Sequence, residues 1–138
     1  MTDPLKTGDV IGILGGGQLG RMLSVAASRL GLRTHIFEPA PNPPAADVAH
    51  RVTTASYDDE RALVDFAKSV NVVTYEFENI PTSALDILEQ HRVIRPRREA
   101  LRVSQDRLIE KTFLNELGLT TAPFVAVNSV DSLAKAMT

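Results

Sequence analysis

Glycines at one place in the chain and carboxylates at another could together bind a phosphorylated ligand. Residues 11–20 read IGILGGGQLG, and Gly15, Gly17 and Gly20 fit the pattern G-x-G-x-x-G between an apolar run and an amphipathic run. Glycines at such a junction let the chain turn tightly, so that a phosphate can approach the first N–H groups of the following helix. The pattern predicts an anion-binding loop, with a tight turn that binds nothing as the simpler alternative.

Two carboxylates are expected near this loop. The segment TYEFENIP ends another apolar run, and strand alternation places Glu76 and Glu78 on one side of it. Carboxylates repel a pyrophosphate, but they accept hydrogen bonds from ribose hydroxyls or from an amine. An anion-binding loop beside such acceptors favours a sugar phosphate as the ligand. A solvated strand end is the alternative interpretation.

A third acid keeps a dinucleotide ligand in consideration. Glu38 follows the second predicted strand, at the position where an acid holds the adenosine ribose in NAD-binding proteins. Together with the glycine pattern it permits an NAD-dependent oxidoreductase domain. A solvated strand end beside a proline-rich loop is the favoured interpretation of Glu38.

Two basic residues in SQDRLIEK could face a polyphosphate. Arg107 and Lys111 are four residues apart in a predicted helix, where like charges alone are mildly unfavourable. A nearby polyphosphate would make the placement of these two positive charges favourable. The favoured alternative is that Arg107 pairs with Glu110 on a solvated helix face.

The elements expected to position these residues alternate between strand and helix. Apolar periodicity predicts strands at 9–14, 33–37, 51–54, 72–77 and 92–94, and helices at 18–30, about 57–70 and 81–90. This order implies right-handed crossovers, so the predicted fold class is α/β, with a Rossmann-like doubly wound parallel sheet. Ligands of such sheets bind at the carboxyl ends of the strands, which is where the glycine loop and the acids fall.

The remainder of the chain is expected to leave this domain. Helices are predicted at 97–103 and 105–117, then a strand at 121–127 and a helix capped by Ser129. The predicted division is a substrate-binding domain at 1–103, a linker helix at 104–119, and the truncated start of a second domain at 120–138.

Composition narrows the class of protein. The net charge of -2 lacks the basic excess of a nucleic-acid-binding protein, and the absence of cysteine excludes disulfides and cysteine metal sites. No apolar run resembles a signal peptide or a membrane span, so a cytoplasmic protein is expected. His35, His50 and His91 lack metal-ligand spacing and no Ser-His-Asp pattern occurs, so we assign no catalytic residue and no metal ligand.

Four segments in this order resemble a known family: GILGGGQLGRML, EPAPNPPAADVAH, TYEFENIP and SQDRLIEKTFLNELGLTTAPF. They are similar to the N-terminal portion of the 5-(carboxyamino)imidazole ribonucleotide synthases, which are ATP-grasp ligases, and the resemblance covers about residues 10–127. It implies a Rossmann-like pre-ATP-grasp domain, followed by a lid and an ATP-grasp domain. It also implies an enzyme of purine biosynthesis that uses ATP, Mg²⁺ and bicarbonate to carboxylate 5-aminoimidazole ribonucleotide. The full-length enzyme implied by the resemblance is a homodimer.

The resemblance also implies roles for particular residues. Gly17, Gln18 and Leu19 would bind the ribonucleotide at its phosphate and sugar end, and Glu76 would accept hydrogen bonds from the ribose hydroxyls. Arg107 would contact the ATP phosphates.

The family's lid lysines and Mg²⁺-binding acids would lie beyond Thr138, so we expect the 138-residue chain alone to be inactive. Two alternatives stay open: the NAD-dependent oxidoreductase domain and a binding module without catalytic function.

Overall fold

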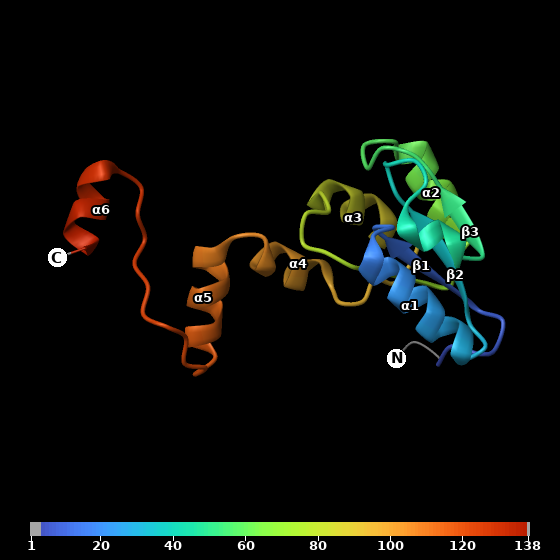
Figure 1. Cartoon of the computed structure of the whole chain (residues 1–138), viewed down its shortest axis with the longest axis horizontal. Helices are drawn as coiled ribbons and strands as arrows, with labels where there is room; N and C mark the ends of the chain where they lie inside the picture. Colours follow the sequence, from blue (N-terminus) through green and yellow to red (C-terminus); the bar gives the residue numbers. More distant parts are fainter. Residues whose placement is uncertain (1–3, 138) are drawn as a thin grey trace. The chain divides into compact units, whose positions relative to one another are not determined.

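The computed structural model describes residues 4–137. The chain divides into two compact units, with the boundary between Leu101 and Arg102. The first unit contains all the strands and the glycine loop, and the second contains the last helices (Figure 1). No helix in the described part of the chain is long and apolar enough to cross a membrane.

The first unit is built on a parallel sheet of four strands in the order β3-β2-β1-β4. The strands are β1 (Val10–Leu14), β2 (Arg33–Phe37), β3 (Arg51–Thr53) and β4 (Val72–Tyr75). They are connected through α1 (Gln18–Arg29), the 3-10 helix η1 (Pro44–Asp47) and α2 (Glu60–Lys68), and α3 (Thr82–Glu89) follows β4. The predicted α/β class with a parallel sheet is confirmed.

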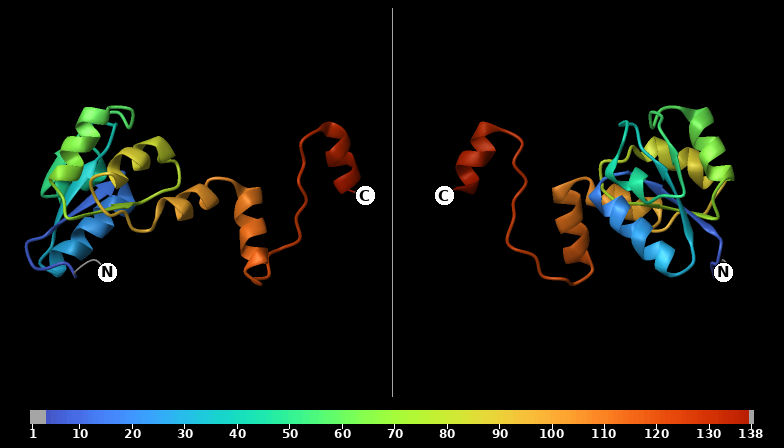
Figure 2. Two further views of the ribbon diagram at one scale, coloured as in Figure 1. Left: turned by 180° about the vertical axis from the view of Figure 1, so that it is seen from behind. Right: turned by 45° about the vertical axis from the view of Figure 1, so that its right-hand side comes forward.

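Helices cover both faces of this sheet. Side chains along a strand alternate between the two faces, so neighbouring residues of one strand pack against different helices. Leu14 and Phe37 pack with residues of α2 and α3 in the main apolar core. Their neighbours Ile13 and Ile36 pack with Ala45 of η1 in a second cluster, and η1 lies against α1. Figure 2 shows α1 and α2 on opposite sides of the strands. The sheet is therefore doubly wound, as predicted.

Local signals account for the ends of several helices. Gly31 follows α1 with φ of 73°, a left-handed conformation that glycine adopts without strain. Ser56 precedes the helix predicted at about 57–70 and is the cap that this prediction implies. In the structure α2 begins later and is capped by Asp59, whose carboxylate accepts a hydrogen bond from the Ala62 amide at 2.9 Å. The Ser56 hydroxyl instead accepts from the Asp58 amide within the preceding turn, at 3.2 Å.

Two predicted strands differ in the structure. The fourth strand ends at Tyr75, two residues earlier than expected, so Glu76 follows the strand instead of belonging to it. The predicted strand at 92–94 is reduced to a single bridge between Val73 and Ile94. The bridge includes a hydrogen bond from the amide of the next residue, Arg95, to the Val73 carbonyl at 2.9 Å.

The last part of the chain contains three helices: α4 (Arg98–Ser104), which crosses the boundary between the units, α5 (Arg107–Glu116) and α6 (Val130–Ala136). Ser129 caps α6 as predicted, in a reciprocal capping box with Ser132. The predicted strand at 121–127 is wrong: this segment has no regular structure. A strand needs a neighbour for its backbone groups, and no described segment pairs with it.

Candidate functional site

Two carboxylates hold the glycine loop between β1 and α1. The Gly16 amide donates to Glu38 Oε2 at 2.8 Å, and the Gly17 amide donates to Glu76 Oε1 at 2.8 Å. The Gly20 amide donates to the second oxygen of Glu76. Both acids are therefore bonded to the predicted anion-binding loop.

Strand order explains why these distant residues meet. Because β1 lies between β2 and β4, the loop that follows β1 is flanked by the residues that follow the other two strands. Backbone hydrogen bonds extend the sheet into the loop: the Gly15 amide donates to the Phe37 carbonyl at 3.0 Å, and the Glu76 amide donates to the Leu14 carbonyl at 3.2 Å. Glu38 and Glu76 are thereby fixed on either side of the loop.

The glycines are required by close contacts as well as by backbone conformation. Gly15 has φ of 99°, and a Cβ atom there would lie 2.5 Å from Glu76 Cγ. At Gly17 a Cβ would lie 2.9 Å from Glu76 Oε1, and at Gly16 it would lie 2.7 Å from Pro43 Cβ. Side chains in the loop would therefore displace the carboxylate or the proline-rich segment.

The first turn of α1 retains two open donors. An α-helix leaves its first amides without intrahelical partners, and Glu76 accepts from two of them, those of Gly17 and Gly20. Within residues 4–137, the amides of Gln18 and Leu19 have no acceptor, and both residues are exposed. These amides lie at the positive end of the helix dipole, which is an anion-binding position. Gly17, by contrast, has its amide occupied by Glu76.

The proline-rich segment packs over this loop. The Ala45 amide donates to the Gly16 carbonyl at 2.9 Å. Arg21 of α1 forms an ion pair with Asp47 at 2.7 Å and also donates to the Pro44 carbonyl at 3.3 Å. The loop is thus held from the sheet side by acids and from the outer side by η1.

Tyr57 is a neighbour of the site that sequence reasoning missed. Burial raises the pKa of its hydroxyl, and the charges of Glu38 and Glu76 raise it further. Tyr57 lies in the turn between β3 and α2, where no periodicity marks a residue. Only the strand order could have indicated that this turn ends near the glycine loop.

The other predicted residues lie elsewhere. Glu78 is in an exposed turn after β4. Arg107 is the first residue of α5, in the second unit, and it pairs with Glu110 at 2.5 Å with 79% of its side chain exposed. The Lys111 ammonium lies 5.3 Å from the centre of the Phe124 ring. The ion pair between Arg107 and Glu110 is the alternative that the residue spacing favoured over contact with a polyphosphate.

The histidines and acids form no metal centre in the part of the chain that the structure describes. His35 is buried, with its ring nitrogens 2.7 Å from Ser69 Oγ and 2.8 Å from Thr53 Oγ1. Burial lowers its pKa to about 4, with smaller effects from Arg51 and His50. His35 is therefore a neutral core residue at physiological pH.

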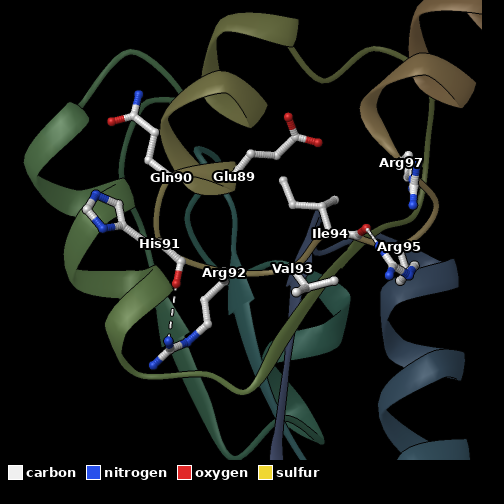
Figure 3. Close-up of a pocket in the computed structure, with 8 residues that line it drawn as sticks. All are labelled: Glu89, Gln90, His91, Arg92, Val93, Ile94, Arg95 and Arg97. Atoms are coloured by element: carbon white, nitrogen blue, oxygen red, sulfur yellow. Dashed lines mark hydrogen bonds between the residues drawn. The ribbon is translucent and has the colours of Figure 1, made fainter. Parts of the chain in front are cut away.

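A separate cavity of about 580 Å³ opens beside β4 and contains none of the predicted site residues (Figure 3). Two of the arginines that line it, Arg92 and Arg95, donate to neighbouring backbone carbonyls. Arg92 donates to the carbonyls of Val70 and His91, and Arg95 donates to that of Ile94. These contacts support the chain after α3 and leave the glycine loop as the candidate site.

The fold and the loop define a class of protein. A doubly wound parallel sheet, with a glycine loop that leads from its first strand into a helix, is a Rossmann-like ligand-binding domain. Residues 9–105 match the ribonucleotide synthetase pre-ATP-grasp domain, and the chain belongs to this family.

Named proteins that are similar to this chain are ligases. The chain is 51% identical to the N5-carboxyaminoimidazole ribonucleotide synthase of Brucella melitensis biotype 1, over 96% of this chain and 37% of the relative. Its structure matches an N5-carboxyaminoimidazole ribonucleotide synthetase solved with ADP, with a TM-score of 0.92 and 39% identity, over 99% of this chain and 36% of the other.

The enzyme of Aspergillus clavatus, solved with ADP and 5-aminoimidazole ribonucleotide, has a TM-score of 0.81 and 33% identity, over 94% of this chain and 35% of the other. The family expected from the four motifs is confirmed. The chain spans little more than a third of the length of these relatives.

Proposed function

We propose that this chain is the ribonucleotide-binding front domain of a ligase that carboxylates 5-aminoimidazole ribonucleotide in purine biosynthesis, with ATP and bicarbonate as co-substrates. The relatives named above support the reaction class. The observation that supports binding in this chain is the placement of two open amides, those of Gln18 and Leu19, beside the Glu76 carboxylate.

The proposed binding mode uses both groups. The phosphate and sugar end of the ribonucleotide accepts hydrogen bonds from Gln18 and Leu19 at the start of α1, where the helix dipole favours an anion. Each oxygen of Glu76 accepts one loop amide and keeps a further lone pair, to which a ribose hydroxyl donates. Gly17 contributes by shape, since its missing side chain leaves Glu76 in place.

ATP is proposed to contact Arg107. The ion pair between Arg107 and Glu110 is exposed, and exposed ion pairs contribute about 0–1 kcal/mol to stability. Replacing Glu110 by a phosphate as the partner of Arg107 therefore costs little. Mg²⁺ and the residues of a lid would come from parts of a full-length enzyme outside the described residues.

We propose residues 1–103 as the binding domain, 104–119 as a linker and 120–138 as the start of the lid domain, in a cytoplasmic homodimeric enzyme. The chain alone is expected to be inactive.

The NAD-dependent alternative receives less support from the geometry. It requires the Glu38 carboxylate to accept hydrogen bonds from an adenosine ribose. Glu38 Oε2 accepts from the Gly16 amide at 2.8 Å, and Oε1 accepts from the Ala40 amide at 2.9 Å. Glu38 has the same number of bonds as Glu76, but its partners Gly16 and Ala40 lie outside α1, whereas Glu76 lies beside the open amides of Gln18 and Leu19.

Ligand-observed NMR on this chain tests the proposal, because saturation transfer detects weak binding. We expect transfer to 5-aminoimidazole ribonucleotide that ribose 5-phosphate reduces by competition. NADH is expected to give no transfer. Transfer to NADH with none to the ribonucleotide would contradict the proposed function.

A further inference from the structure

The Glu38 carboxylate is held against the glycine loop. Its Oε2 accepts from the Gly16 amide at 2.8 Å, and its Oε1 accepts from the Ala40 amide at 2.9 Å. Glu38 directly follows β2, at the position where the acid of a dinucleotide-binding domain accepts hydrogen bonds from a ribose. In this chain the acid instead occupies a loop amide and brings a negative charge to the loop.

The space beside Gly16 is filled as well. A Cβ atom at Gly16 would lie 2.7 Å from Pro43 Cβ and 3.0 Å from Glu38 Cβ. The Ala45 amide donates to the Gly16 carbonyl at 2.9 Å, which holds the proline-rich segment in this position. A ligand therefore has no free amide at Gly16 and little room beside it.

The donors that stay open fit one phosphate. They are the adjacent amides of Gln18 and Leu19, and the amides on either side of them, those of Gly17 and Gly20, donate to Glu76. One phosphate can accept from both open amides. The second phosphate of a diphosphate would have no free backbone donor in residues 15–20 and would lie near two carboxylates, which repel it at short range.

We propose that Glu38 is a specificity-determining residue of the ribonucleotide site, and that its charge limits the glycine loop to ligands with a single phosphate. This inference rests on the function proposed above, in which a ribose monophosphate must bind in the presence of ATP. ATP and dinucleotides carry adjacent phosphates, so the charge of Glu38 disfavours them in the loop. Glu76 repels them too, but it is also the proposed acceptor of the ribose hydroxyls.

The test compares inorganic phosphate with pyrophosphate by NMR titration of this chain, with the amide signals of Gln18 and Leu19 as the readout. Pyrophosphate should bind the wild type no more tightly than phosphate, despite its higher charge. Glu38→Gln keeps an oxygen that can accept a loop amide and removes the charge. The affinity for pyrophosphate relative to phosphate should then rise by about five-fold, because pyrophosphate places a further charge near residue 38.

Two control variants isolate the charge of Glu38. Glu89→Gln removes an equal charge at the separate cavity and should leave the affinity ratio unchanged. Glu38→Asp keeps the charge at the loop and should keep the ratio of the wild type. Thermal unfolding of all variants measures the structural part of the Glu38 contacts separately.

A lower midpoint of unfolding in Glu38→Gln with an unchanged affinity ratio would mean that Glu38 only fastens the loop, and would overturn the inference. Tighter binding of pyrophosphate than of phosphate by the wild type would overturn it as well, without the need for a variant. A wild-type chain whose Gln18 and Leu19 signals did not respond to 5-aminoimidazole ribonucleotide would overturn the proposed function itself.

Discussion

Glu76 and Gly17 are 59 residues apart in the chain, yet the Gly17 amide donates to Glu76 Oε1 at 2.8 Å. The other oxygen of the same carboxylate accepts the Gly20 amide. One side chain therefore both caps α1 and presents an acceptor beside the open amides. The predictions below separate these two roles.

Replacing Glu76 should affect stability and binding together. Glu76→Ala removes the acceptor of two amides, and loss of a helix cap costs about 1–2 kcal/mol. Ribonucleotide binding should fall below detection. Urea unfolding and NMR titration of the same samples measure the two effects, with Glu89→Ala as the control, since Glu89 lines the separate cavity. Unchanged affinity in Glu76→Ala would refute the assigned role of this carboxylate.

Gly15 and Gly8 form a matched pair for the contact with Glu76. Their φ angles are 99° and 94°, so alanine is strained at both, but only at Gly15 would a Cβ meet another group, Glu76. Gly15→Ala should therefore destabilise the protein by about 1–3 kcal/mol more than Gly8→Ala, the range for overpacking. Equal free energies of unfolding for the two variants would mean that the Glu76 contact is unimportant.

His35 should make stability depend on pH. Its pKa is lowered from 6.5 to about 4 in the folded chain, so between these values the unfolded chain binds more protons. The stability that depends on neutral His35 is complete above pH 6.5 and is lost as the pH falls toward 4. The loss is roughly 2 kcal/mol once screening by nearby solvent is allowed for.

Urea unfolding between pH 7.5 and 5 measures this loss. His35→Leu should be less stable than the wild type at pH 7.5 but should lack this part of the pH dependence. His91→Gln, at an exposed position, should keep it. Arg51 and His50 also lower the pKa of His35, so their charges are kept in all three proteins. A slope that survives in His35→Leu would assign the pH dependence to other groups.

Much of the fold could be predicted from the sequence, because it depends on local patterns. The start of α1 at Gln18 and the bounds of β2 agree with the apolar periodicity. The expected strand at 121–127 failed for a non-local reason. Apolar, β-branched residues favour a strand, but a strand needs a partner, and no described segment supplies one.

The candidate site could be predicted only in part. The sequence indicated that Glu76 lies near the glycine loop, since both follow strands of a parallel sheet. It did not indicate that Glu76 accepts two loop amides, or that Glu38 clamps Gly16, since these contacts depend on strand order and on the early end of β4. Tyr57 was missed for the same reason.

The most direct test of the account is a per-residue NMR titration of the 138-residue chain with 5-aminoimidazole ribonucleotide. The account predicts that the amide signals of Gln18 and Leu19 shift most, and that the ribonucleoside without its phosphate shifts them much less. Shifts that leave Gln18 and Leu19 unchanged and gather instead around Arg95 and Arg97 would contradict it.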